Sequence, residues 1–400
     1  MKVVVAIDSF KGSMTSMQAG NACKEGILAA AHAHCGSGAA AAKDRKPAAD
    51  NMKVVVKPLA DGGEGTVEAL VEGMSGTYEY VPVTGPMGNP VKARYGILPD
   101  QTVVMEMAEA SGITLVKEPL NPWKAASTGV GEMILDAVQK GCRKFIIGIG
   151  GSATTEGGIG MLSALGYDFM DENGDILPPV FASLEKVVQI ENNRVPEMLK
   201  DCHFQIACDV TNPLCGVEGC VYVFGAQKGV KEEEKESMDR AMQSYAACME
   251  KFTGKKLSEI PGTGAAGGLG FAFLWGLPNV ELKPGIDIVL EAVGLASELQ
   301  DADIVVTGEG CLDFQTAMGK VPVGVAKIAK NYNCKVIAFA GSVTEEAKKC
   351  NEKGIDAFFS ILPGVCSLDE AMDTEIAQKN MRNAAEQVFR LILDLYEHKT

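Results

Sequence analysis

The residues best suited to chemistry lie in one short loop, Asp61-Gly62-Gly63-Glu64-Gly65. The loop follows an apolar run at residues 54–56 that predicts a buried strand, and it precedes a helix that Thr66 can cap. Glycines at such a turn let backbone amides approach a ligand closely. The two carboxylates beside them indicate either a bridging Mg²⁺ or a base for a substrate hydroxyl, and a glycine-rich surface turn with solvated acids is the alternative.

Other candidate residues also follow predicted strands. Asp8-Ser9-Phe10-Lys11 comes directly after the apolar strand 2–7, where open α/β sheets bind ligands. The run 204–214 predicts a strand that delivers Asp209 into a turn, and the run 221–229 predicts another that ends at Lys228. These residues supply carboxylates, hydroxyls and ammonium groups, which suit phosphoryl transfer.

Two glycine-rich stretches are similar to a nucleotide-binding fingerprint. Gly148, Gly150 and Ala153 spell G-x-G-x-x-A after a predicted strand, but Ser152 and its hydroxyl-bearing and acidic neighbours fit a phosphate or carboxylate loop better than a nicotinamide site. The second stretch, residues 262–267, matches GxGxxG but follows Ile-Pro instead of a strand. It is more typical of an anion-binding nest at the start of a helix.

The pattern of elements predicts an α/β protein with two domains. Strands alternate with helices at both ends of the chain, whereas the runs 92–98 and 102–107 indicate a hairpin. We therefore expect a doubly wound parallel-sheet domain from residues 1–83 plus 289–400, and an inserted mixed α/β domain from residues 84–288.

Composition excludes several classes of protein. The formal net charge of -15, without a basic run, argues against nucleic acid or an anionic membrane as partner. Only four histidines are present, so a histidine triad or a histidine-rich metal site is not expected. No signal peptide or membrane-length apolar run is evident, and we expect a cytoplasmic protein. The Ala/Gly-rich segment 35–52 is expected to form a surface excursion without function.

With these motifs in order, the chain resembles bacterial-type glycerate kinases that phosphorylate D-glycerate. The matching pieces run from residue 6 to residue 326 and include AIDSFKGSMTS, VVKPLADGGEGTVEAL, IGIGGSATTEGGIGM, VFGAQKG, PGTGAAGGLG and TGEGCLDFQTAMGKVPVGVA. The resemblance implies a flavodoxin-like domain built from both chain ends, an inserted domain, and an active site in the cleft between them. It also implies organic acid phosphorylation in glycerate metabolism, with ATP and Mg²⁺ and with a monomer or homodimer.

Phosphoryl transfer needs a phosphate cradle, a divalent cation with further positive charge, and an orienting base, and the resemblance lets each role be assigned to candidate residues. The catalytic candidates are Asp8, Lys11, Asp61 and Asp209. Of these, Asp8 and Asp209 are expected to accept a hydrogen bond from the glycerate hydroxyl. The candidates for binding substrate or nucleotide are Ser9, Gly62, Gly63, Gly150, Gly151, Ser152, Lys228, Gly264 and Gly267. The candidate Mg²⁺ ligands are Glu64, Glu309 and Asp313. Each carboxylate has an alternative role as a helix cap or loop acceptor.

Alternatives remain at three levels. The resemblance favours 2-phosphoglycerate as the product, and 3-phosphoglycerate is the alternative. An NAD-dependent hydroxy-acid dehydrogenase would explain the G-x-G-x-x-A loop, and a non-catalytic sensor would explain departures from the family pattern. Those departures are Cys311 in place of the usual Arg, Thr155-Glu156 in place of Asn-Asp, and Ala226 in place of Pro.

Overall fold

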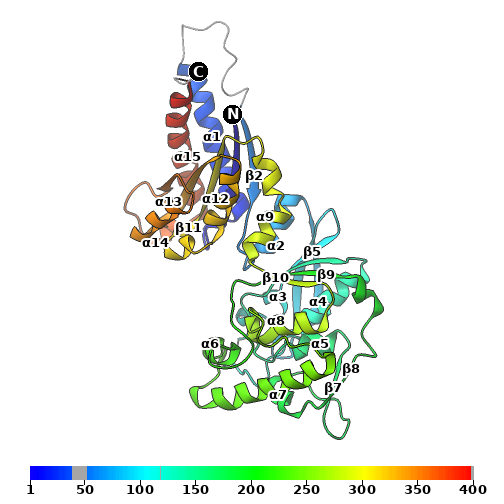
Figure 1. The fold of residues 1–400 in the computed structure, drawn as a ribbon. Coiled ribbons are helices and arrows are strands. Elements are labelled where there is room, and N and C mark those ends of the chain that lie inside the picture. The colour runs from blue at the N-terminus through cyan, green and yellow to red at the C-terminus, as the bar shows by residue number, and fades with distance from the viewer. Residues whose placement is uncertain (38–51, 118, 398–400) are drawn as a thin grey trace. The chain divides into compact units, whose positions relative to one another are not determined.

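The computed structural model describes residues 1–37, 52–117 and 119–397, and residues 38–51 of the Ala/Gly-rich segment therefore lie outside the described residues. The described chain forms two compact units. The terminal unit comprises residues 1–61, 68–74 and 289–400, and the central unit comprises residues 62–67 and 75–288. The predicted α/β class is confirmed by the elements described below (Figure 1), while the domain limits derived from the sequence stay a prediction.

The terminal unit contains a five-stranded sheet in which every neighbouring pair is parallel, in the order β13-β12-β11-β1-β2. Its strands are β1 (Lys2–Ile7), β2 (Lys53–Pro58), β11 (Ile304–Leu312), β12 (Lys335–Val343) and β13 (Ala357–Ser360). The apolar runs 3–7 of β1 and 304–306 of β11 form strands because both faces of a parallel sheet are covered by helices. In the register of these two strands, Ile7 lies beside Gly308.

Helices cover this sheet on both faces. The helices of the terminal unit are α1 (Ser16–Ser37), α10 (Leu295–Leu299), α11 (Phe314–Ala317), α12 (Val321–Asn331), α13 (Lys349–Glu352), α14 (Leu368–Met372) and α15 (Thr374–Glu397). Helices α2 (Thr66–Met74) and α9 (Gly285–Ala292) begin in residues assigned to the central unit and end in residues assigned to the terminal unit. Helices α1 and α15 lie side by side and share one apolar core with β1 and β11 (Figure 1). A Cβ on Gly26 would lie 2.2 Å from the Arg382 carbonyl oxygen, so the close approach of these helices requires glycine. Helix α12 contacts β1, β11 and β12 without joining that core, and it covers the opposite face.

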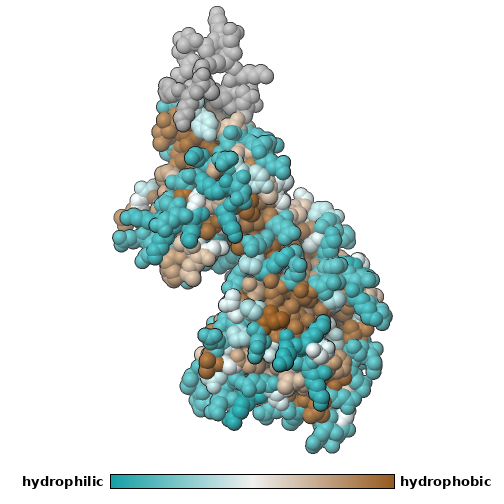
Figure 2. All heavy atoms as spheres, viewed as in Figure 1, coloured by the Kyte–Doolittle hydropathy of each residue, from teal (hydrophilic) through white to brown (hydrophobic). Residues whose placement is uncertain are grey.

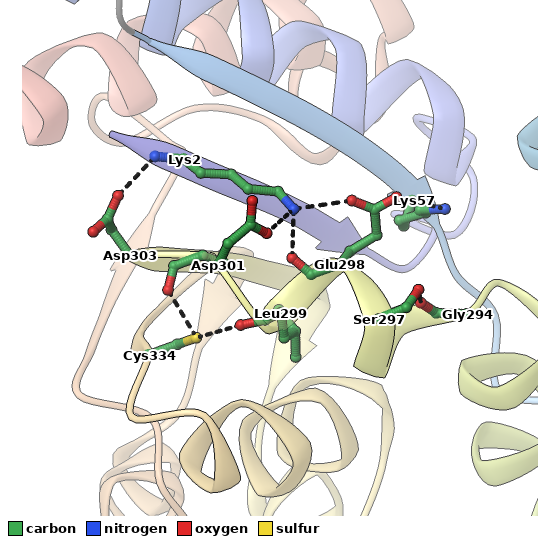
Figure 3. Close-up of polar contacts among 10 residues, drawn as sticks. Lys2, Lys57, Gly294, Ser297, Glu298, Leu299, Asp301, Asp303 and Cys334 are labelled. Carbon is green, nitrogen blue, oxygen red and sulfur yellow. Dashed lines mark hydrogen bonds and ion pairs between the residues drawn. The ribbon is translucent and has the colours of Figure 1, made fainter.

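An ion cluster around the buried Lys2 joins the start of the sheet to α10 (Figure 3). The Lys2 ammonium lies 3.1 Å from a carboxylate oxygen of Glu298, donates to the Glu298 carbonyl at 2.7 Å, and also pairs with Asp301. Lys57 approaches the same Glu298 carboxylate at 3.4 Å. Burial alone would lower the pKa of Lys2, but its hydrogen bonds to Asp301 and Glu298 outweigh that effect and raise the pKa. The cluster therefore holds α10 against β1.

The central unit contains a six-stranded mixed sheet in the order β10-β9-β6-β5-β4-β3, and a separate antiparallel sheet of two short strands, β7 and β8. The strands are β3 (Thr77–Thr84), β4 (Pro90–Ile97), β5 (Thr102–Glu106), β6 (Lys144–Gly148), β7 (Asp168–Met170), β8 (Gln189–Glu191), β9 (His203–Ala207) and β10 (Val280–Lys283). Strands β4 and β5 pair antiparallel, as the hairpin pattern predicts, and β3 adds antiparallel to β4. Strands β5, β6, β9 and β10 pair parallel. The helices are α3 (Ala108–Ser111), α4 (Thr128–Gln139), α5 (Ile159–Ala164), α6 (Cys220–Phe224), α7 (Lys235–Thr253) and α8 (Ala265–Gly276).

The strand predicted over residues 221–229 is wrong. Residues 220–224 form the short helix α6, and a 3₁₀ turn over residues 226–228 follows it. The buried residues Cys220 and Val221 pack α6 into the central core, next to α7 and α8. A short apolar run can take either form, and this tertiary packing overrides its β propensity.

Hydrophilic residues cover most of the visible surface of each unit (Figure 2). Among the described residues, no helix combines the length and the apolar character that a membrane span requires.

Candidate functional site

The first candidate pocket lies in the terminal unit where the connections from neighbouring strands diverge. From β1 the chain continues through α1 to β2 on one side, and from β11 it continues through α12 to β12 on the other. Open α/β sheets bind ligands at such a switch point, outside the carboxyl ends of the strands. A cavity of about 410 Å³ lies there. Its polar lining includes Asp8, Ser9, Lys11, Asp61, Glu309, Asp313, Lys320 and Ser342.

Two buried carboxylates dominate this pocket. Asp8 directly follows β1 and is 6% exposed, and Glu309 lies in β11 and is 7% exposed. Burial, together with the neighbouring charges of Asp61 and Glu309, raises the pKa of Asp8 from 3.8 to about 7, although the hydrogen bond from the Ser9 amide opposes this rise. Burial likewise raises the pKa of Glu309 to about 7, although the Thr316 hydroxyl donates to it. A cation bound in the pocket would offset the cost of keeping both buried carboxylates charged.

Two lysines offer positive charge in the same pocket. The Lys11 ammonium lies 3.9 Å from an Asp61 carboxylate oxygen, and its side chain is 67% exposed. A pair this long and this exposed stabilises little and leaves the ammonium able to reorient toward a ligand. Lys320 precedes α12 and was missed by the sequence analysis. Its signal was Gly319-Lys320 just before a helix, a position where cations and amides meet phosphates.

The candidate metal ligands do not form one cluster. Asp313 accepts hydrogen bonds from the backbone amides of Gln315 and Thr316 at 2.8 and 3.1 Å and caps α11, which is the alternative role that the sequence left open. Glu64 is exposed, belongs to the central unit, and lines none of the pockets described here. In the described parts of the chain, no group of three or more His, Cys, Asp or Glu side chains could hold a metal ion.

The second pocket lies in the central unit at the carboxyl ends of β6 and β9. Its cavity measures about 340 Å³. Predicted residues that the structure brings together in its lining are Gly62, Gly63, Gly150, Gly151, Ser152, Asp209 and Lys228. Gly62 has a φ of +87°, and a Cβ there would lie 2.5 Å from the Cα of Gly285, so this position requires glycine. The glycine loops therefore bring bare backbone to the cavity wall.

Lys228 is the central cation of this pocket. Its side chain is 2% exposed, and its ammonium donates to the Ser152 hydroxyl at 2.7 Å and to the Thr154 carbonyl at 2.6 Å. Burial lowers the pKa of Lys228 from 10.5 to about 8, and electrostatic interactions with Cys220 and Glu156 partly oppose that shift. An ammonium carries three N–H groups, so two are used by the protein and one can donate to an anion in the cavity.

Asp209 supplies a carboxylate to the same cavity. It follows β9, as the sequence predicts, and its Oδ1 accepts a hydrogen bond from the Gly285 amide at 2.9 Å. This bond orients the carboxylate at the end of the strand.

Gly264 and Gly267 lie outside the lining of both pockets. The Gly264 amide donates to the Asn212 carbonyl at 3.0 Å. A Cβ on Gly267 would lie 2.1 Å from the Thr154 carbonyl oxygen, so this glycine permits the close packing of α8 against the loop that carries Ser152. Their neighbours Ala265 and Ala266 line the cavity instead, and a direct role of the two glycines in binding stays a prediction.

Comparison with known proteins places this arrangement in a family. A profile of the glycerate kinase family matches residues 3–393. The chain is 41% identical over 392 residues to glycerate kinase of Bacillus subtilis (strain 168), covering 97% of this chain and 98% of the relative. It is 41% identical over 373 residues to glycerate 2-kinase of Escherichia coli (strain K12), covering 93% of each.

A solved structure agrees with the sequence relatives. The crystal structure of the Salmonella typhimurium LT2 protein named "putative glycerate kinase 2" matches with a TM-score of 0.87 and 39% identity, covering 99% of each chain. The resemblance seen in the motifs is thus confirmed over nearly the full chain, which belongs to the glycerate kinase family of phosphotransferase enzymes.

Proposed function

We propose that the protein transfers the γ-phosphoryl group of ATP to the 2-hydroxyl of D-glycerate and releases 2-phosphoglycerate and ADP. The relatives named glycerate kinase and glycerate 2-kinase support this substrate class. The observation that carries the proposal is the pair of buried carboxylates, Asp8 and Glu309, at the switch point of the terminal sheet.

The carboxylate pair fits a magnesium ion. Mg²⁺ bound in kinases typically takes one or two protein carboxylates and completes its shell with water and substrate phosphates. Asp8 and Glu309 would hold the ion, and Lys11 and Lys320 would contact the phosphates from the same pocket. When bound, the ion would offset the negative charge of the nucleotide phosphates. Metal binding by Glu64 and Asp313 stays a prediction.

The central pocket suits glycerate. The third N–H of Lys228 would donate to the substrate carboxylate, with the amides of the Gly150-Gly151 loop beside it. Asp209 would accept the proton of the 2-hydroxyl while the hydroxyl oxygen forms a bond to the γ-phosphorus. The bond from that phosphorus to the β–γ bridging oxygen breaks, and ADP leaves with the bonding electron pair.

The dehydrogenase alternative lacks structural support. After β6, residues 149–158 form a loop before α5 begins, whereas a dinucleotide fingerprint opens directly into its helix. Neighbouring side chains also contribute a hydroxyl and an ammonium to this loop. These groups favour an anion over a nicotinamide ring.

The test is an assay of the purified chain with D-glycerate, ATP and Mg²⁺, with the product identified by ³¹P NMR. ADP release with a 2-phosphoglycerate signal supports the proposal. A 3-phosphoglycerate signal would keep the kinase and overturn the position of transfer. ADP release no greater than with L-glycerate would refute the substrate assignment.

A further inference from the structure

The lining of the terminal pocket contains two chemically different groups of residues. One group is the carboxylates and lysines described above. The other is an apolar wall that we define as Leu362, Leu368, Ala371 and Met372. Leu368 is 76% exposed and Met372 is 38% exposed, although both line the cavity. Large apolar side chains that face a cavity and remain exposed indicate that a ligand covers them.

The apolar wall is firmly attached to the loop that follows β1. The Thr374 hydroxyl donates to the Ser13 carbonyl at 2.7 Å, which ties the start of α15 to this loop. Met372 packs on Gly12, where a Cβ would lie 2.3 Å from the methionine Cε. A hydrogen bond from the Glu370 amide to the Ser367 hydroxyl caps α14, which carries Leu368. The wall is therefore preformed and needs no rearrangement to accept a ligand.

The two groups of lining residues together match the chemistry of a nucleotide. Its phosphates are anionic and bind cations, whereas its base is a flat ring with large apolar faces. A cavity of about 410 Å³ falls in the usual size range of small-molecule sites. Ser342, at the end of β12, adds a hydroxyl to the lining, and such a group can bond the edge of a base or a ribose.

We propose that the apolar wall, with Leu368 and Met372 at its centre, is the nucleobase subsite of this kinase. This inference rests on the proposed use of a nucleotide, and it adds the place where the base binds. The base lies on the wall, and the phosphates extend toward Asp8 and Glu309 in the same cavity.

The test compares two exposed apolar positions that lie three residues apart. Leu368→Ser removes an apolar contact from the wall, whereas Val365→Ser is a matched control because Val365 is fully exposed and lines none of the pockets described here. Mg-ADP binding is measured by calorimetry on the full chain, and thermal unfolding checks that both variants fold. We expect Leu368→Ser to weaken Mg-ADP binding about tenfold and Val365→Ser to leave it unchanged. The KM for D-glycerate should stay within twofold of the wild-type value in both.

Each result separates this inference from the proposed function. Equal Mg-ADP affinity in wild type and Leu368→Ser, with an active wild type, would overturn the base subsite alone. Weaker binding in Leu368→Ser together with no glycerate turnover by the wild type would support the subsite and refute the substrate assignment. Equal weakening by Val365→Ser, or no Mg-ADP binding by the wild type, would overturn the subsite.

Discussion

The buried lysine of the central pocket allows binding and folding to be tested separately. Lys228→Met keeps the length and the apolar stem of the side chain while it removes the charge and every donor. In the structure these donors serve the Ser152 hydroxyl and the Thr154 carbonyl, at 2.7 and 2.6 Å. The substitution therefore acts on the anion site and on two buried acceptors at once.

The two effects of Lys228→Met on stability oppose each other. The fall in the pKa of Lys228 from 10.5 to about 8 means that keeping this buried ammonium charged costs about 3 kcal/mol. Between these two pKa values the unfolded chain binds more protons than the folded one, so stability rises with pH there, and the full cost is present below pH 8. Removing the charge relieves this cost, whereas each abandoned acceptor costs about 1–3 kcal/mol. We expect the variant to fold, with a free energy of unfolding within about 3 kcal/mol of the wild-type value.

The effect on activity should have no compensating gain. Loss of a buried charged donor to a substrate carboxylate costs about 2–5 kcal/mol, which corresponds to a fall in kcat/KM for D-glycerate of roughly 30-fold to several thousandfold. In the wild type, kcat/KM should fall about tenfold per pH unit above pH 8, because this ratio reports the pKa of the free enzyme. The variant has no ammonium to lose and should lack this decline.

The assay measures ADP directly by chromatography from pH 6.5 to 10, at saturating ATP and Mg²⁺. Lys200→Met serves as the control, because Lys200 is 73% exposed and pairs only with Glu197 among the described residues. An alkaline decline centred near pH 10.5, or a Lys228→Met variant within twofold of wild type, would refute the placement of the substrate carboxylate at Lys228.

Three further substitutions probe the terminal unit. Asp8→Asn should lower kcat/KM by about 10²-fold or more and raise the Mg²⁺ concentration needed for half-maximal rate, and an unchanged Mg²⁺ requirement would contradict the metal assignment. Cys311→Arg adds a cation to an exposed position in the pocket lining and should lower the KM for ATP about three- to tenfold, whereas an unchanged KM would show that this position does not face the phosphates. Lys2→Met leaves Glu298 and Asp301 without their shared partner. Because these acids are partly exposed, we expect urea unfolding to show a free energy of unfolding about 1–2 kcal/mol lower than in the wild type, with unchanged kcat. A loss of activity would be inconsistent with a purely structural cluster.

Sequence patterns located the strands well because parallel strands carry continuous apolar runs. The runs over β1, β6 and β11 are bounded by polar loop residues, and those loops hold Asp8, Ser152 and Asp313. The same reasoning failed at residues 221–224, because the sequence of so short an apolar run does not distinguish a strand from a helix. The partners of that run in the core decide its form, and they come from distant parts of the chain.

The chemistry of the site depends on burial, and burial is a property of the assembled fold. The sequence places Lys228 near a turn, but its lowered pKa follows from burial in the assembled fold, and its two acceptors lie 74 and 76 residues earlier in the chain. The apolar wall was even less predictable from sequence. Leu368 and Met372 lie in a short helix without a chemical motif, and only the packing of that helix against the loop after β1 gives them a cavity to line. Polar residues after strands can therefore be predicted as candidates from sequence alone. Exposed apolar residues gain a functional interpretation only when the structure shows which polar groups share their pocket.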